Sequence, residues 1–292
     1  MSDASLRQRA IALYDAFTHE HRDRRRFMAD LTRLAGGVGA AELLLAGIAA
    51  DPAAAAIIAE DDPRVASRML RWPVGQGRTL SGYWAQPRAG GLRPAVMVIH
   101  ENRGLQPYTK DVARRLAVAG FNALAPDLLS GEGGTPTDED KAREMIHALD
   151  LARTVTEAIA TLRWLAEKPR STGKVGVVGF CWGGALADRI AVEAGALPSA
   201  IVSFYGPCPD PALAARVQAP LLLHYAGLDT RVDATARPWI AALKAHHKDF
   251  ASYVYPGVNH AFHNDTAPDR YNAAAAKLAW DRTIAFFRKT LA

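Results

Sequence analysis

The segment Gly179-Phe-Cys-Trp-Gly-Gly184 places a cysteine between glycines at the junction of two different sequence patterns. The preceding run, 174–178, is short and apolar like a buried strand, and the following run, 185–191, has the composition of a helix. A residue at the centre of such a strand-to-helix turn admits only glycine-sized neighbours. The pattern predicts a nucleophile elbow that exposes Cys181 above the sheet, where the helix N-terminus favours the thiolate.

A purely structural interpretation of this segment stays open, because free cysteine is often buried and a glycine-rich turn can serve only close packing. The residues downstream favour catalysis. Asp229 follows the apolar run 220–225, and His260 follows the run 251–256, so both are expected in loops at the carboxyl ends of strands. Cys181, Asp229 and His260 therefore occur in the order nucleophile, acid, histidine that such sheets use.

Strand and helix patterns alternate from residue 95 onward, which predicts parallel strands joined by crossover helices. Strands are expected at 95–100, 121–125, 174–179, 200–205, 220–225 and 252–255, with an additional edge strand at 80–86. Helices are expected at 109–119, 139–167, 183–194, 234–246 and 271–290. The fold class is therefore α/β, a mostly parallel sheet with helices on both faces. We expect a catalytic domain at 71–292 and an N-terminal helical extension at 1–70.

The extension allows two interpretations. Residues 23–28 carry consecutive arginines and precede an Ala/Leu/Gly-rich stretch at 31–50, as in a twin-arginine export signal. Arg33 and Glu42 interrupt that stretch, and an amphipathic helix at 6–17 precedes the arginines, which favours helices packed on the catalytic domain. The stretch is also too short and too interrupted for a transmembrane helix. We therefore expect a cytoplasmic protein without a membrane partner, with periplasmic export as the alternative.

Charge and cysteine content narrow the range of partners. The net charge of +5 is modest and no basic cluster is interleaved with aromatic residues, so nucleic-acid binding is not expected. The two cysteines, Cys181 and Cys208, do not form a disulfide framework, and Cys208 is expected to be structural. His263 lies close to His260 but lacks further ligands at suitable spacing, so we expect neither a metal nor a cofactor. Nothing in the sequence sets the oligomeric state.

The motifs around Cys181, Asp229 and His260 resemble those of the dienelactone hydrolase family, the cysteine-nucleophile branch of the α/β-hydrolase fold. The resemblance rests on Gly-Phe-Cys-Trp-Gly-Gly, on Tyr-Ala-Gly-Leu-Asp, on Asn-His-Ala-Phe-His-Asn and on Val-Ile-His-Glu-Asn-Arg-Gly at 98–104. It extends from about residue 81 to the C-terminus. It implies a Cys-His-Asp triad that cleaves a small ester or lactone through a thioester acyl-enzyme.

The resemblance also implies roles for residues around the triad. Glu101 would contact the resting cysteine and move as substrate binds, and the backbone N–H groups of Asn102 and Trp182 would form the oxyanion hole. Because both donors belong to the main chain, the side chains at those two positions say little about them. Arg103, Tyr205 and His263 are candidates for the substrate pocket.

The chain departs from the family where dienelactone-cleaving members hold a substrate carboxylate with arginines. The corresponding positions here are Asn264, after the histidine motif, and 128–131, after Pro126-Asp127. A bidentate guanidinium is hard to replace, so a neutral substrate is expected instead of dienelactone itself. A thioesterase or an amidase would use the same triad, and a non-catalytic binding or regulatory protein could have kept the fold. The complete triad, together with Glu101, argues against the non-catalytic alternative.

Overall fold

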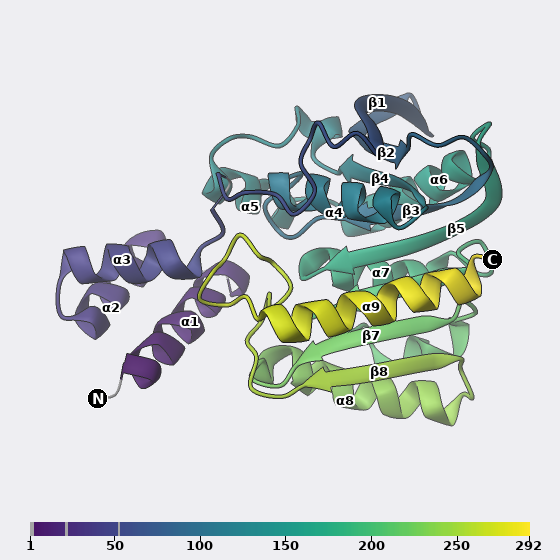
Figure 1. Cartoon of the computed structure of the whole chain (residues 1–292). Coiled ribbons are helices and arrows are strands. Elements are labelled where there is room, and N and C mark those ends of the chain that lie inside the picture. Colours follow the sequence, from purple (N-terminus) through teal and green to yellow (C-terminus); the bar gives the residue numbers. More distant parts are fainter. Residues whose placement is uncertain (1–2, 21–22, 52) are drawn as a thin grey trace.

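The computed structural model describes residues 3–20, 23–51 and 53–292 (Figure 1). In this part of the chain, a sheet of eight strands has the order β1-β2-β4-β3-β5-β6-β7-β8. Strand β2 pairs antiparallel with both β1 and β4, and the other neighbouring strands pair in parallel. The strands are β1 (Val65–Gly75), β2 (Arg78–Pro87), β3 (Arg93–Ile99), β4 (Asn122–Asp127), β5 (Ser171–Phe180), β6 (Ala200–Phe204), β7 (Leu221–Ala226) and β8 (Phe250–Tyr255).

Helices cover both faces of the sheet, as the alternating pattern predicts. Helices α4 and α9 pack on one face, and α6, α7 and α8 pack on the other. The helices are α1 (Asp3–His19), α2 (Arg24–Ala35), α3 (Val38–Ile48), α4 (Pro107–Val118), α5 (Glu139–His147), α6 (Leu151–Ala166), α7 (Trp182–Glu193), α8 (Thr230–Ala245) and α9 (Ala273–Thr290). The predicted α/β class is confirmed.

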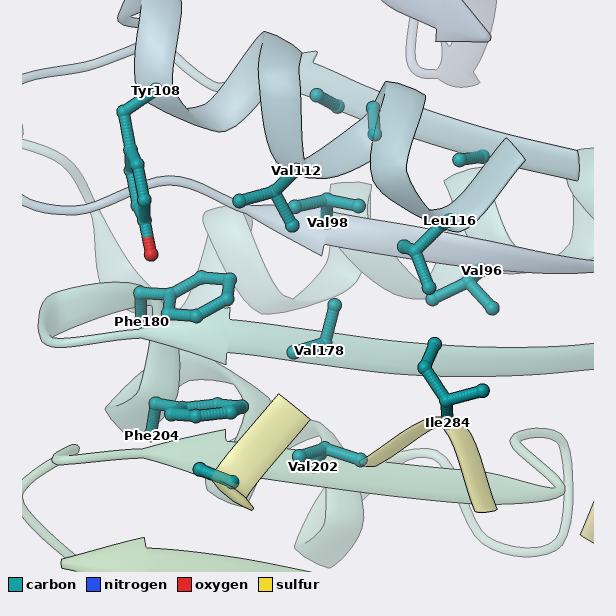
Figure 2. Packing of buried hydrophobic residues seen from close by; sticks show 14 of the residues in the cluster. Val96, Val98, Tyr108, Val112, Leu116, Val178, Phe180, Val202, Phe204 and Ile284 are labelled. Carbon is teal, nitrogen blue, oxygen red and sulfur yellow. The ribbon is translucent and has the colours of Figure 1, made fainter. Parts of the chain in front are cut away.

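The central strands β3, β5 and β6 are apolar without alternation because both of their faces are covered. Figure 2 shows one of the two apolar layers, in which α4 and α9 lie over these strands. The labelled side chains of the layer are Val96, Val98, Tyr108, Val112, Leu116, Val178, Phe180, Val202, Phe204 and Ile284. This packing fixes the strand ends from which the candidate site residues project.

Two predictions about individual elements are wrong. The strand expected at the sheet edge, 80–86, is β2 and lies between β1 and β4. The outermost strand on this side of the sheet is β1. Its exposed residues Arg68 and Arg71 interrupt any regular apolar alternation. The single helix expected over 139–167 is two helices, α5 and α6, because the Asp150 side chain accepts a hydrogen bond from the Arg153 N–H at 3.1 Å and begins a new helix. The proposed domain boundary, 70/71, falls inside β1.

Helices α1, α2 and α3 pack together and lie beside the carboxyl ends of the parallel strands (Figure 1). Their apolar cluster includes Ile11, Tyr14, Phe17, Phe27 and Leu31, with the rings of Phe17 and Phe27 stacked at 4.5 Å. The residues considered as an export signal form α2 and α3. Among the described residues, no single helix is long and apolar enough to cross a membrane. Helices α2 and α3 meet that criterion only when they are taken together, and the pair is bent by 108°.

Candidate active site

Cys181 occupies the predicted turn between β5 and α7 with backbone angles of φ 56° and ψ −116°. These angles are strained for a residue with a side chain. The flanking glycines are required by close approach: a Cβ atom on Gly179 would lie 1.9 Å from the carbonyl oxygen of Gly183, and one on Gly183 would lie 2.5 Å from that of Ile99. The local geometry is that of a nucleophile elbow.

The sequence-based expectation that this elbow exposes Cys181 is wrong. The side chain is only 3% exposed, because α1 covers the elbow. The Nε2 atom of His19, the last residue of α1, lies 3.2 Å from the Sγ atom of Cys181. A residue far away in the sequence therefore contacts the candidate nucleophile directly.

Asp229 and His260 meet at the carboxyl ends of β7 and β8, as their positions predict. The Nδ1–H group of His260 donates to Oδ2 of Asp229 at 2.5 Å, and the other oxygen of Asp229 accepts from the Val232 N–H at the start of α8. In the neutral imidazole, this arrangement places the hydrogen on Nδ1 and leaves a lone pair on Nε2. The Nε2 atom is buried and has no hydrogen-bond partner among the described residues.

Two neighbouring groups shift the pKa of His260 upward against the effect of burial. Burial lowers the pKa of His260, but the Cys181 thiolate and the Asp229 carboxylate together raise it to about 10. Burial raises the pKa of Asp229, but attraction to His260 and the hydrogen bond between them outweigh burial and hold this pKa below its ordinary value. The two groups thus stabilise each other in their charged forms.

Glu101 lies in the same cavity as Cys181, and its carboxylate is held by other residues. The Tyr205 hydroxyl donates to Oε1 at 3.4 Å, and the Asn264 amide donates to Oε2 at 2.8 Å. The Tyr205 ring also packs against the His260 ring, with centroids 5.0 Å apart. In this structure the hydrogen-bond partner of Cys181 Sγ is His19, and the contact that the resemblance implies for Glu101 stays a proposal.

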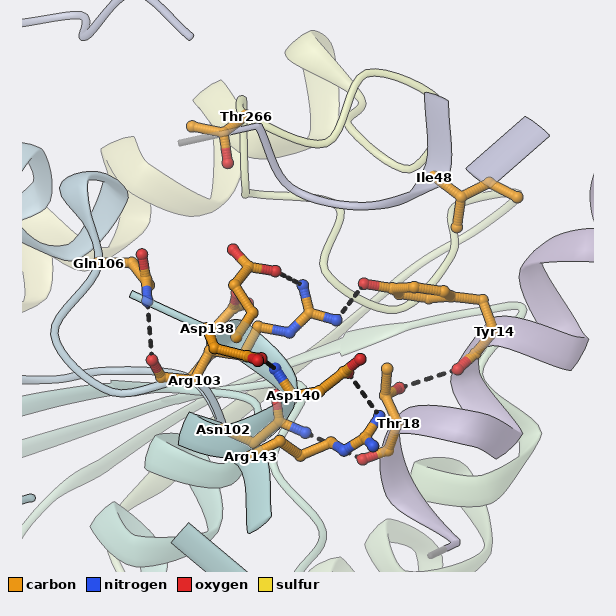
Figure 3. A network of polar contacts seen from close by, with 12 residues as sticks. Tyr14, Thr18, Ile48, Asn102, Arg103, Gln106, Asp138, Asp140, Arg143 and Thr266 are labelled. Atoms are coloured by element: carbon orange, nitrogen blue, oxygen red, sulfur yellow. Dashed lines mark hydrogen bonds and ion pairs between the residues drawn. The ribbon is translucent and has the colours of Figure 1, made fainter. Parts of the chain in front are cut away.

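The candidate oxyanion donors flank the elbow. Asn102 lines the cavity, and its side-chain amide donates to the carbonyl oxygen of Thr18 at 3.0 Å, which ties α1 to the loop after β3 (Figure 3). Trp182 begins α7, and its ring stacks on that of His100 at 5.7 Å. Helix α1 therefore lies beside Asn102, one of the two candidate oxyanion donors.

Arg103 lies in the cavity wall, but its guanidinium group is already engaged. It forms an ion pair with Glu139 and donates to the Tyr14 hydroxyl (Figure 3). Arg270, in the loop before α9, also lines the cavity. Its Nε–H donates to the Ile48 carbonyl oxygen at 2.8 Å, and its guanidinium lies 5.1 Å from the centre of the Tyr14 ring. Both arginines are thus tied to the N-terminal helices.

The cavity over Cys181 is small. Its volume is about 40 Å³, and one water molecule needs about 10–15 Å³ of such space. A few water molecules fit, whereas an ester with an aromatic ring fits only if part of the wall moves. Its wall includes Thr18, His19, Glu101, Cys181, His260 and Asn264.

Two of the residues weighed in the sequence lie away from this cavity. His263 is buried beneath it, with Nδ1 2.6 Å from the Tyr108 hydroxyl, and it lines a different cavity near α9. Cys208 contacts the Tyr225 hydroxyl at 3.2 Å, and burial raises the pKa of its thiol.

His19, Cys181 and His260 are the described residues whose arrangement comes closest to a metal site. Their donor atoms lie within 4.8 Å of one another.

Residues 80–291 match the model of the dienelactone hydrolase family. The chain belongs to that family. The resemblance drawn from the motifs is confirmed, and with it the assignment as a carboxymethylenebutenolidase-like hydrolase of ester and lactone bonds.

A curated protein of Saccharolobus solfataricus, which carries a provisional carboxymethylenebutenolidase name, is 33% identical over 249 residues, covering 73% of this chain and 95% of its own. A crystal structure described provisionally as a dienelactone hydrolase, from Klebsiella pneumoniae, superposes with a TM-score of 0.69 at 26% identity and covers 77% of this chain and 99% of its own. An alpha/beta hydrolase from a Medee basin deep-sea metagenome, 16% identical with a TM-score of 0.59, covers 77% of this chain and 98% of its own. The α/β-hydrolase fold is confirmed.

Sequence reasoning missed the active-site residues of the extension. Tyr14 belongs to the amphipathic pattern at 6–17 and His19 lies just beyond it, and no local motif marks either of them. Arg270 lies six positions beyond Asn264 in the same loop, so only the folded loop shows that it reaches the cavity.

Proposed function

We propose that this hydrolase cleaves small neutral esters or lactones with a Cys181–His260–Asp229 triad. The observation that carries the proposal is the 2.5 Å contact between His260 Nδ1 and Asp229 Oδ2, which leaves a buried, unpartnered Nε2 atom next to the elbow cysteine. In this tautomer the imidazole can accept the thiol proton. The confirmed family membership supports the same chemistry.

The reaction then has two halves. In acylation, the proton of Cys181 moves to His260 Nε2, the sulfur electron pair forms the bond to the carbonyl carbon, and the carbonyl π pair moves onto oxygen. The tetrahedral intermediate collapses as His260 returns the proton to the leaving alkoxide. In deacylation, His260 takes a proton from water, which attacks the thioester and releases the acid and the thiol. The backbone N–H groups of Asn102 and Trp182 are the proposed oxyanion donors.

The preference for a neutral substrate follows from the state of Arg103. Its guanidinium is paired with Glu139 and bonded to Tyr14, so a substrate carboxylate would have to replace an existing ion pair. A carboxylate that entered the buried cavity without such a partner would lose its hydration uncompensated, at a cost of several kcal/mol. Neutral esters and lactones carry no such penalty.

The test is turnover of p-nitrophenyl acetate by the wild type and by Cys181→Ala, with mass spectrometry of the rapidly quenched enzyme. The proposal expects nitrophenol release by the wild type, none above background by Cys181→Ala, and an acetyl group on the peptide that contains Cys181. Turnover by Cys181→Ala at the wild-type rate would refute the nucleophile assignment. A panel of matched esters, lactones, thioesters and amides then separates the esterase from a thioesterase or an amidase, and no turnover of any of them would favour a binding protein.

A further inference from the structure

The last residue of α1 completes the surroundings of the nucleophile. We propose that His19 is a catalytic residue: it stabilises the protonated thiol of resting Cys181 by accepting its hydrogen at Nε2, and Cys181 ionises toward His260 when His19 is displaced. The inference rests on the triad proposed above and adds a group from outside the part of the chain that matches the family.

The tautomer of His19 is fixed by its other ring nitrogen. Nδ1 lies 2.8 Å from the backbone carbonyl oxygen of Asp15, which can only accept a hydrogen bond, so Nδ1 carries the hydrogen. In a neutral ring, Nε2 then holds a lone pair. Because Nε2 lies 3.2 Å from Cys181 Sγ, the hydrogen between these two atoms has to come from the thiol.

The surroundings keep the His19 ring neutral. Burial, and then repulsion from His260 and Arg231, lower the pKa of His19 well below its ordinary value of 6.5. A protonated ring that could donate to a thiolate is therefore disfavoured. The ionisable groups that face His19 and Cys181 from the adjoining elements are Asp15, Glu101, Tyr205, Asp229, Arg231, His260 and Arg270.

Two imidazoles thus compete for one hydrogen. His260 is the second acceptor: its Nδ1–H group is bonded to Asp229, and the thiolate that most raises its pKa is absent while Cys181 keeps its proton, so the ring can be neutral with a lone pair at Nε2. The thiol of Cys181 can satisfy only one of the two nitrogens. Rotation about the Cβ–Sγ bond would turn the hydrogen from His19 to His260, where proton transfer breaks the S–H bond and leaves the sulfur electron pair free to attack. His19 therefore favours the thiol, and His260 favours the thiolate.

Substrate entry and release of the thiol hydrogen are coupled through α1. An ester with an aromatic ring does not fit the cavity of about 40 Å³ unless part of its wall moves, and Tyr14, Thr18 and His19 of α1 form part of that wall. Polar contacts hold α1 in place: Asn102 donates to the Thr18 carbonyl oxygen, Arg103 donates to the Tyr14 hydroxyl, and Gln8 donates to Asn259 at 2.7 Å. A substrate that displaces His19 removes the acceptor that favours the thiol, so the nucleophile ionises once its target is present.

The experiment measures the rate of iodoacetamide modification of Cys181 against pH in the full-length protein, by mass spectrometry of the peptide. The midpoint of the profile reports ionisation of the thiol, and the plateau at high pH reports access to it. His19→Phe keeps a ring of similar bulk and removes the lone pair. We expect the midpoint of His19→Phe to lie about one pH unit or more below that of the wild type, which is about a tenfold change in the ionisation constant.

Two further variants separate the proton effect from shielding. His19→Ala removes the bulk as well, so its midpoint should fall in the same way while its plateau rises. Tyr14→Phe breaks the bond to Arg103 and loosens α1 without altering His19, so it should change the plateau and leave the midpoint in place. If His19→Phe unfolds, as its circular dichroism would show, His19→Ala alone supplies the midpoint.

A midpoint that stays at the wild-type value in the folded His19 variants would overturn the proposal and leave α1 as a steric cover. A midpoint that rises would overturn it too, since His19 would then stabilise the thiolate. Neither result depends on the proposed function, which is judged by the turnover of Cys181→Ala. An inactive Cys181→Ala combined with an unmoved midpoint would mean that the triad stands and only the role of His19 fails.

Discussion

The guanidinium group of Arg103 is paired with the carboxylate of Glu139, the first residue of α5, at the wall of the cavity that contains Cys181. This pair uses the positive charge that the loop after β3 would otherwise offer to an anionic substrate. Substrate preference thus depends on an internal ion pair as well as on the arginines that are absent from the expected positions.

The first prediction concerns the charge of the substrate. We expect kcat/KM for a neutral lactone or ester to exceed that for a carboxylated dienelactone, by at least about tenfold, which corresponds to 1.4 kcal/mol. The measurement is kcat/KM for both substrates in one buffer. A preference for the carboxylated compound would show that Arg103 or Arg270 binds it after all.

Glu139→Gln provides a second, more specific prediction. The substitution keeps the shape of the side chain and removes the charge that pairs with Arg103. The ratio of kcat/KM for the carboxylated over the neutral substrate should rise several-fold. Glu144→Gln, on the same helix but outside the residues that line the cavity, is the matched control and should leave the ratio unchanged.

A third prediction separates the roles of the acid and the base. His260→Ala removes the proton acceptor, and Asp229→Asn favours the wrong tautomer of His260. Each should lower kcat by about 10³-fold or more. Asp233→Asn changes a carboxyl group one turn further along α8 that does not bond to His260, and it should keep kcat within about twofold. Near-normal kcat in Asp229→Asn would contradict the hydrogen bond on which the mechanism depends.

The fourth prediction compares the two thiols. Burial, followed by repulsion from Asp188, raises the pKa of Cys208, whereas Cys181 lies at the N-terminus of α7, within 4.8 Å of the His260 imidazole. Iodoacetamide at neutral pH should therefore modify Cys181 first. Peptide mapping at low reagent excess checks the order, and preferential labelling of Cys208 with full retention of activity would count against the assignment.

A fifth prediction concerns stability. Asp188 of α7 is fully buried, accepts a hydrogen bond from the Ser203 hydroxyl at 3.0 Å, and has its pKa raised by burial to about 8. Below about pH 4 the carboxyl group is neutral in both the folded and unfolded states. As the pH rises toward 8, the unfolded chain loses this proton first, so the free energy of unfolding falls.

Asp188→Asn removes that titration. Its free energy of unfolding, relative to the wild type, should increase between pH 4 and pH 8 by an amount on the order of a few kcal/mol, and level off above pH 8. Urea unfolding at several pH values measures the difference. Glu193→Gln, at an exposed position of the same helix, should show no comparable trend. A flat difference across this range would mean that Asp188 ionises normally.

The elbow and the loops after β7 and β8 could be predicted because each is encoded locally. The glycines around Cys181 are required by contacts within the turn. Asp229 follows the fully buried strand β7, and His260 follows β8, the neighbouring strand at the edge of the sheet. Parallel pairing then brings the strand ends together without further information.

The remaining features depend on contacts between distant segments. Strand β1 lies at the sheet edge, where exposed arginines are tolerated, so its sequence lacks the alternation by which strands are recognised. The break between α5 and α6 preserves the apolar periodicity and is marked only by the cap at Asp150. His19 reaches Cys181 because α1 docks across the strand ends, and its own helix gives no sign of that docking.

The two carboxylate oxygens of Asp229 bind different partners, the first turn of α8 and the imidazole of His260. Serine or threonine could begin the helix equally well, yet neither would hold the imidazole. A carboxylate supplied from elsewhere could hold the imidazole but would leave the helix start open. Selection for folding and selection for turnover therefore act on the same side chain, and they reject different replacements. Fewer substitutions of Asp229 should therefore be tolerated than either requirement alone would allow.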